Sequence, residues 1–494
     1  MQDKVLELAK ESDNAIDSKD DDSIKKVIEK CSDMIETLSD SNEIGYAYYC
    51  MGNLYAALDN YEVPALNSYR LAKKSSIDEL NYYDLICKIK TNEANQLSRQ
   101  YRYIEAISVY DEFIRHIIPS ESKIISLIHT INNLCSIGQF IKNKNIAQYY
   151  FIKALMLKRV LLEIKKIPNI DKHYHDHDQI NTFLTQHPLQ EQENIEDGIK
   201  SLQDIGSKDL FRKSEQEYRT WCLENILFLN HMNDLVFSYH DAKDTISFPD
   251  YIIDLDNDCF VKPHLAMAFA NIKREFCFAR YLAYEGISKK YPKFEEKHLG
   301  LASEYYNSDY SGKTERLKAS FRFAFGLLDK SVNLLISYLK LDKNEIKKTK
   351  GCRIVEFKPK FFETHLKEFM RNNEFIKALY FVACELNNQS EFRHDNVQND
   401  LLLGEAKHFK NLRNDLEHNW VHVLEFIFGD PKCCEQDYAT YIESEQLEYD
   451  TIKVLKLVRS CLIYLVFAIQ IEENKQESND EKLIKLKVPI WSSK

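Results

Sequence analysis

The feature that most constrains the fold of this chain is its shortage of turn-forming residues. Only 12 glycines and 10 prolines are spread over 494 residues. Strand-rich folds need such residues at their many tight turns, so their scarcity argues against a Rossmann or β-sandwich architecture. Hydrophobic residues make up 44% of the chain and aromatic residues 12%, which is ample for folded cores. We therefore predict an all-α protein with two or three domains.

Composition also bears on partners and compartment. A net charge of −11 gives no global nucleic-acid footprint, so any RNA contact must be local. The twelve cysteines include no Cys-x-x-Cys pair and the first residues lack a signal-peptide pattern, which favours a reducing, cytoplasmic location. The longest apolar run, Cys461–Ile469, is too short to span a bilayer. We expect a cytoplasmic protein with no membrane segment.

A repeat runs through residues 40–165. Two positions recur every 41 residues, the first as Ala65, Ala106 and Ala147 and the second as Tyr69, Tyr110 and Phe151. A fixed period is typical of stacked supersecondary units. Together with Gly52 and Tyr55 upstream, the order resembles the tetratricopeptide repeat, whose usual period is about 34 residues. The resemblance implies a groove for a protein or peptide ligand; the alternative is that the repeats only support the neighbouring domain.

The stretch from Asn411 to Ile427 predicts an amphipathic helix with an unusual polar face. At 100° per residue, its apolar side chains fall within an arc of about 120°. Asn414, His418 and His422 recur every fourth residue on the opposite face. An ordinary solvated face carries Lys and Glu more often, so we interpret this row of an amide and two imidazoles as presented to a ligand.

The spacing Arg413-Asn414-x-x-x-His418 resembles the Arg-x4-His signature of the HEPN superfamily, all-helical domains many of which are metal-independent endoribonucleases. The resemblance implies a homodimer in which two motifs face each other across one cleft. It also implies an RNA substrate and no metal or other cofactor.

In such a site, His418 would perform acid/base work, because histidine is the side chain suited to proton transfer near neutral pH. Arg413 would stabilise the charge on the phosphorane, and Asn414 would orient the pair. Cleavage would leave a 2′,3′-cyclic phosphate. The alternative interpretation is an ordinary surface pair between Arg413 and Glu417, four residues apart, with His418 merely exposed.

Two further stretches are related to this resemblance. Residues 218–235, YRTWCLENILFLNHMNDL, resemble a segment of a HEPN subfamily that is preceded by tetratricopeptide repeats, and we expect a packed helix there. Residues 261–289 predict a long helix with Pro263 near its start. By the resemblance, Glu275 and Arg280 on this helix are secondary site candidates; His422, from the polar row described above, is another. The alternative role of Glu275 and Arg280 is an ion pair within the domain.

The most basic run lies between Lys343 and Lys360. Four cations within it are candidates for holding an RNA backbone, unless the run is only a solvated loop: Lys347, Lys348, Lys350 and Arg353. The alternation of His and Asp from His173 to Asp178 imitates a metal site. This stretch lies in a polar insertion with no further ligand cluster nearby, so we expect no metal there. A metal hydrolase, a further alternative function, would require a metal bound at this stretch.

Other helices are predicted over Thr314–Leu341 with Thr314 as N-cap, over 361–386 and over 445–471. These elements give four regions: repeats in 1–165, a helical connector in 166–258, a HEPN-like helical domain in 259–471, and a charged linker with a docking tail in 472–494. The leading hypothesis is a ribonuclease controlled by the repeats, of the kind found in toxin or antiviral defence proteins. The alternative is a non-catalytic adaptor that dimerises and binds protein partners.

Overall fold

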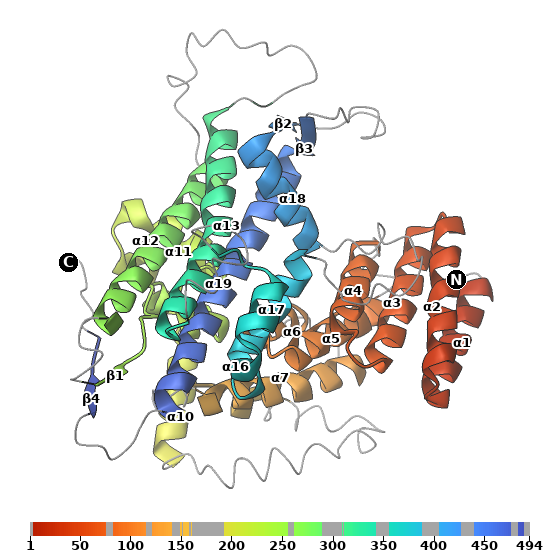
Figure 1. Cartoon of the computed structure of the whole chain (residues 1–494), viewed down its shortest axis with the longest axis horizontal. Coiled ribbons are helices and arrows are strands. Elements are labelled where there is room, and N and C mark those ends of the chain that lie inside the picture. Colours follow the sequence, from red (N-terminus) through yellow and green to blue (C-terminus); the bar gives the residue numbers. More distant parts are fainter. Residues whose placement is uncertain are drawn as a thin grey trace. The chain divides into compact units, whose positions relative to one another are not determined.

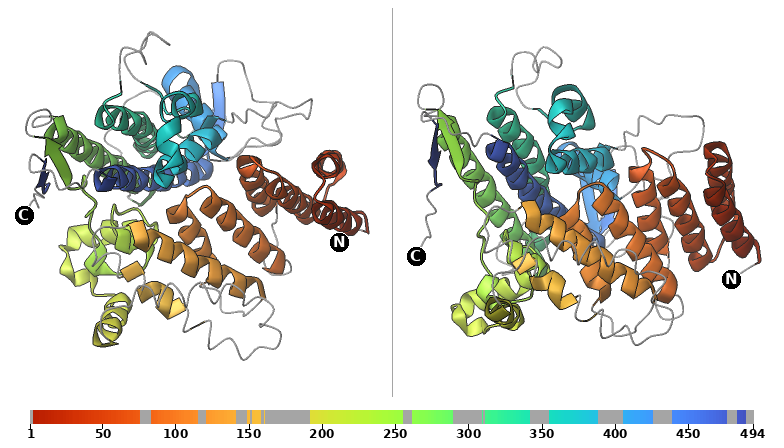
Figure 2. Two further views of the ribbon diagram at one scale, coloured as in Figure 1. Left: turned by 60° about the horizontal axis from the view of Figure 1, so that its bottom comes forward. Right: turned by 90° about the horizontal axis from the view of Figure 1, so that it is seen from below.

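The protein is mostly helical, which confirms the predicted fold class. The computed structural model describes residues 3–75, 83–114, 121–140, 149–150, 152–157, 160, 192–254, 261–288, 309, 311–341, 355–387, 405–425, 439–475 and 483–488. The chain divides into two compact units, the first made of residues 1–204 and 388–407 and the second of residues 205–387 and 408–494. Each unit is described by itself below (Figures 1 and 2).

The first unit is a succession of helices that pack against their sequence neighbours (Figure 1). Its described helices are α1 (Asp3–Ser18), α2 (Asp21–Thr37), α3 (Ser41–Ala57), α4 (Glu62–Ser75), α5 (Tyr83–Arg99), α6 (Tyr103–Ile114), α7 (Glu121–Phe140) and α10 (Gln192–Gln203). Asp20 and Asp40 cap α2 and α3 by accepting hydrogen bonds from backbone N–H groups of the first turn. Helix α3 packs against α4 and α5 against α6, so this part of the chain consists of helix pairs.

The repeated tyrosines occupy equivalent places in two of these pairs. Tyr69 on α4 donates its hydroxyl to Asn53 Oδ1 on α3 at 2.8 Å. Tyr110 on α6 donates to Asn95 Oδ1 on α5 at 2.5 Å. The ring of Tyr69 lies so close to Gly52 that a Cβ there would be 2.6 Å from Cε1, which explains the glycine. The third set, Ala147 and Phe151, lies outside the residues whose side chains are described, and the tetratricopeptide assignment stays a prediction.

The second unit is built around three long helices (Figure 1). Helices α12 (Val261–Ser288), α13 (Gly312–Tyr338) and α19 (Ser444–Lys475) pack against one another through fully buried side chains such as Phe276, Phe321 and Leu462. Shorter elements surround them: α11 (Lys213–Glu224), α15 (Pro359–His365), α16 (Lys367–Arg371), α17 (Glu374–Asn387), α18 (Glu405–His418) and the 3₁₀ turns η2 (Lys208–Leu210), η3 (His231–Asp234) and η4 (Tyr239–Asp241).

Helix α19 contains an uninterrupted run of buried residues from Leu457 to Ile469. It is long and apolar enough to cross a membrane by length and composition, with a mean hydropathy of 1.9 over its most apolar window, but 83% of that window is buried inside the protein. Residues on every side of the helix are inaccessible, including Val458, Leu462 and Ile463. A helix that is apolar all round is expected at the centre of a large bundle, and α19 is the core helix here.

The helix predicted over 218–235 is only half correct. Helix α11 ends at Glu224, and Ile226 adopts a left-handed φ of 55° that turns the chain. Two buried arginines then use the backbone of the turn: Arg280 donates to the Leu227 carbonyl and Arg459 to the Phe228 and Asn230 carbonyls. These carbonyls bond to side chains from distant helices, so the helical ladder stops here.

The helix predicted over 411–427 is also shorter than expected. Helix α18 ends at His418, where the Asn419 N–H donates to the Asp415 carbonyl at 2.8 Å. Residues Trp420–Leu424 form strand β2, which pairs in parallel with β3 (Ala439–Glu443). From Trp420 to Val423, exposed or half-buried residues alternate with the buried Val421 and Val423, which is the two-residue period of a strand; Leu424 at the end of β2 is also buried. The apolar residues that share one arc of the helical wheel therefore belong partly to helix α18 and partly to strand β2.

Three smaller differences concern element boundaries. The region 361–386 forms α15, α16 and α17 instead of one helix, because Asn373 accepts the Ile376 N–H at 3.2 Å and starts α17 anew. The N-cap of α13 is Ser311, whose side chain accepts the Thr314 N–H, and not Thr314 itself. In the tail, β4 (Leu483–Leu486) pairs antiparallel with β1 (Tyr251–Asp254).

Candidate functional site

The Arg-Asn-x-x-x-His motif lies in the last turns of α18. Arg413 Nη1 donates to Asn414 Oδ1 at 3.1 Å, and its Nη2 lies 3.1 Å from Glu417 Oε2. The surface pair expected from the four-residue spacing is therefore present. It does not use every donor of the guanidinium: Nε is buried and has no hydrogen-bond partner among the described residues. Arg413 thus keeps one buried donor for another group.

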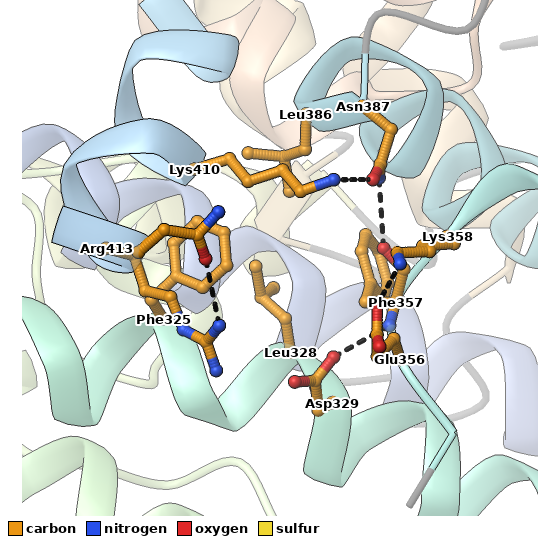
Figure 3. A pocket seen from close by; sticks show the side chains of 11 residues that line it. Phe325, Leu328, Asp329, Glu356, Phe357, Lys358, Leu386, Asn387, Lys410 and Arg413 are labelled. Atoms are coloured by element: carbon orange, nitrogen blue, oxygen red, sulfur yellow. Dashed lines mark hydrogen bonds and ion pairs between the residues drawn. The ribbon is translucent and has the colours of Figure 1, made fainter. Parts of the chain in front are cut away.

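Arg413 and Asn414 form part of the wall of a pocket of about 400 Å³ (Figure 3). Helix α18 contributes these two residues and Lys410. The other polar lining residues come from α13, from α17 and from the segment before α15, and they are Asp329, Asn387, Glu356 and Lys358. The apolar lining residues are Phe325, Leu328, Phe357 and Leu386. This volume falls in the usual range for small-molecule sites.

Cations outnumber carboxylates around this pocket, with Lys358, Lys410 and Arg413 against Asp329 and Glu356. Lys358 forms an ion pair with Glu356. Lys410 donates to the neutral amide oxygen of Asn387. Burial lowers the pKa of Lys410, and the charges of Lys358 and Arg413 lower it further. The positive charges of Lys358, Lys410 and Arg413 repel one another, so an anion bound between them would be stabilised.

The carboxylate on the floor of the pocket has its own partner. Asp329 Oδ1 accepts the Phe357 N–H at 2.7 Å and so fixes the segment that carries Glu356 and Lys358. Burial raises the pKa of Asp329, while this hydrogen bond and the charge of Arg413 oppose the rise. Asp329 therefore shapes the wall opposite α18 and offsets part of the positive charge.

His418 does not line this pocket. It is the final residue of α18, its side chain is 71% exposed, and its Nε2 lies 3.8 Å from Glu417 Oε2. Within one chain, Arg413 and Asn414 thus face the pocket while His418 faces solvent. Arg413 and His418 are five residues apart, so their side chains point about 140° apart around the helix. One copy of the chain therefore does not bring Arg413 and His418 together in one site.

The secondary candidates lie at other places. His422 is on β2, not on the helical row expected from the sequence, and its ring stacks on Tyr441 with centroids 5.3 Å apart. Glu275 on α12 forms an ion pair with Lys330 on α13. Arg280 is 3% exposed and binds Asp244 through both terminal nitrogens at 2.8 Å. Neither residue lines the pocket, and both form the ion pairs considered as their alternative role.

Several predicted sites fall outside the described residues. These are the basic candidates Lys347, Lys348, Lys350 and Arg353, and the alternating histidines and aspartates from His173 to Asp178. Within the described part of the chain, no group of three or more His, Cys, Asp or Glu side chains is placed to hold a metal ion.

Sequence reasoning missed part of the pocket. Lys410 precedes Arg413 by three residues and Asn414 by four, a spacing that puts all three on one helix face, so the helical wheel contained this signal. Lys358 belongs to the basic run between Lys343 and Lys360, but it is not one of the four predicted RNA-binding cations of that run. Asp329 and Asn387 had no local signal, because only the packing of α13 and α17 brings them to α18.

Comparison with known proteins found one family model that matches this region. Residues 257–472 match the LA2681-like HEPN family, and this segment contains α12, α13, the pocket and the whole Arg-Asn-x-x-x-His motif. A search of curated proteins and a search of solved structures each found no match. The match supports a helical HEPN domain in the C-terminal part of the chain.

Proposed function

We propose that this protein is a metal-independent endoribonuclease of the HEPN type whose active site is completed by a second copy of the chain. One observation carries the proposal: Arg413 lines a pocket suited to an anion, and its buried Nε has no hydrogen-bond acceptor among the described residues. A guanidinium with unused donors is well suited to a phosphate group, which it binds through two parallel hydrogen bonds. HEPN domains are often ribonucleases, and the matched family covers this residue.

The reaction needs a base, an acid and a phosphate-binding cation. His418 would take the proton of the 2′-OH, whose oxygen attacks the neighbouring phosphorus. The P–O5′ bond breaks, the leaving O5′ takes a proton from water, which acts as the acid, and the products carry a 2′,3′-cyclic phosphate and a 5′-OH. Arg413 would neutralise the charge that develops on the phosphorane, and Asn414, which accepts from Arg413, would hold the guanidinium in place.

The divergence of two motif side chains supports the proposed second copy. Arg413 and His418 of one chain diverge, so a composite site would combine Arg413 from one copy with His418 from its partner. A twofold arrangement would create two such sites. The N-terminal helix pairs would bind a protein or peptide and control the nuclease, which is the arrangement expected of a toxin or antiviral defence effector.

A mixing experiment tests both the chemistry and the composite site. We would measure cleavage of a mixed RNA pool in EDTA by wild type, Arg413→Ala, His418→Ala, and the control His264→Ala, which alters an exposed histidine of α12. We expect the first two variants to lose about 10²–10⁴-fold in rate and the control to retain full activity. Retained activity in His418→Ala would exclude this residue as the acid/base group.

Mixing the two inactive variants then distinguishes a shared site from a site within one chain. Half of randomly formed dimers contain one copy of each variant, and each mixed dimer has one intact site of two. We therefore expect about a quarter of the wild-type activity to return. No recovery from a mixture that is shown to exchange subunits would contradict the composite site.

The second candidate is a non-catalytic adaptor. Two observations favour it: Arg413 is engaged by Glu417, and His418 is exposed away from the pocket. It predicts no cleavage by wild-type protein at any protein concentration, together with binding of a protein partner that the His418→Ala variant retains.

A further inference from the structure

The pocket beside Arg413 contains more positive charge than the ribonuclease chemistry requires. Arg413 would serve the cleaved phosphate, but Lys410 and Lys358 also face the cavity. Among the described residues, Lys410 forms no ion pair with a carboxylate, and its ammonium is held by the amide oxygen of Asn387. The two carboxylates of the pocket are engaged elsewhere, since Glu356 pairs with Lys358 and Asp329 accepts the Phe357 N–H. The half-buried Lys410 ammonium therefore has no direct carboxylate partner among the described residues, which is unusual for such a group.

The rest of the lining suits a nucleotide better than a simple ion. Phe325, Leu328, Phe357 and Leu386 form an apolar surface beside the cations, and Figure 3 shows Lys410 and Arg413 on one side of the cavity with Lys358 on the other. A ligand that satisfies both surfaces carries a phosphate and a flat apolar body. Single-stranded nucleic acids are bound in this way, by cations along the backbone and by apolar contact with the bases.

We propose that this pocket is a substrate subsite that holds the nucleotide next to the cleaved bond of a single-stranded RNA, with Lys410 and Lys358 on its phosphate and its base against the apolar wall. The inference rests on the proposed ribonuclease function, because the RNA is placed by the position of Arg413. Lys410 and Lys358 are positioning residues here, and they take no part in proton transfer.

The phosphate could belong either to an RNA strand or to a free nucleotide, so the experiment measures both. Binding of a short mixed-sequence 2′-O-methyl RNA, which lacks the attacking hydroxyl and cannot be cleaved, is followed by fluorescence anisotropy at several salt concentrations. AMP is titrated in parallel. The variants are Lys410→Gln and Lys358→Gln, and the matched control is Lys360→Gln, which alters an exposed lysine two residues from Lys358 that does not line the pocket.

We expect each pocket variant to bind the RNA about tenfold more weakly, as for loss of a charged hydrogen bond. The slope of log K against log salt should fall by about 0.7 in magnitude, because one phosphate contact is lost from a single strand. The control should match wild type in both. Thermal unfolding of all variants shows whether they are folded, and Lys→Gln preserves a side chain able to bond to Asn387.

The outcomes separate this inference from the proposed function. Equal RNA binding by wild type, both pocket variants and the control would overturn the subsite even if the protein cleaves RNA. Lysine-dependent RNA binding without any cleavage would support an RNA pocket while the nuclease proposal fails. Lysine-dependent AMP binding that is tighter than RNA binding would assign the pocket to a free nucleotide and overturn the substrate subsite.

Discussion

Arg459, at the centre of α19, offers the sharpest test of how the second unit is held together. Its side chain is 2% exposed, and so is that of its partner Asp234. Nη1 and Nη2 bind the two Asp234 oxygens at 2.7 and 2.8 Å, while Nε and Nη2 also donate to the carbonyls of Phe228 and Asn230 at 2.6 and 3.0 Å. One guanidinium thus fixes the irregular segment after α11 onto the core helix.

The Arg459→Met substitution preserves much of the apolar volume but removes all four of these hydrogen bonds. Breaking a buried ion pair by removing one partner costs about 3–5 kcal/mol, and each carbonyl left without a donor adds about 1 kcal/mol or more. Partial entry of water offsets some of this cost. We expect a loss of about 5 kcal/mol, which is comparable to the whole stability of many domains.

Urea denaturation followed by tryptophan fluorescence measures this loss, since Trp221 lies in α11 beside Tyr284, with ring centroids 5.6 Å apart. The control is Arg371→Met, which breaks an ion pair with Glu368 whose side chains are 64% and 76% exposed; exposed pairs contribute about 1 kcal/mol at most. If Arg459→Met were no less stable than Arg371→Met, the segment would not depend on this guanidinium and the reasoning would be refuted.

Two further predictions concern packing and pH. Gly52→Ala should destabilise the first unit by about 1–3 kcal/mol, because the added Cβ would overlap the Tyr69 ring. Gly326→Ala on α13 should instead stabilise its helix by about 1 kcal/mol, because a Cβ there meets nothing within 4 Å. Thermal unfolding that ranks the two variants alike would contradict this. Burial lowers the pKa of His231 to about 3 from 6.5, so between these values the unfolded chain binds a proton that the folded chain does not. Stability should therefore fall by about 1.4 kcal/mol per pH unit as pH drops from 6.5 towards 3, and the pH dependence of His231→Phe should be flatter by that amount.

The sequence predicted the long helices well and the short elements poorly. The helix expected over 261–289 is α12 (Val261–Ser288), and the one expected over 445–471 lies within α19 (Ser444–Lys475). Both have apolar residues at helical spacing over many turns, so the local signal is repeated often enough to be decisive. The stretch 411–427 has the same apolar arc, but Trp420–Leu424 pairs with a distant strand, and no local pattern contains that partner.

For the candidate site, the sequence by itself determined which residues form the motif, and only the tertiary structure decided their surroundings. Arg413, Asn414 and His418 follow from a local motif, and a helix fixes the angle between their side chains. The pocket required α13, α17 and the segment before α15 to meet α18, which places Asp329, Asn387 and Lys358 beside Arg413. The packing of apolar helix faces brings these segments together, and the local sequence around the lining residues does not indicate it. Local spacing therefore identifies the candidate residues, and packing between distant segments selects what accompanies them.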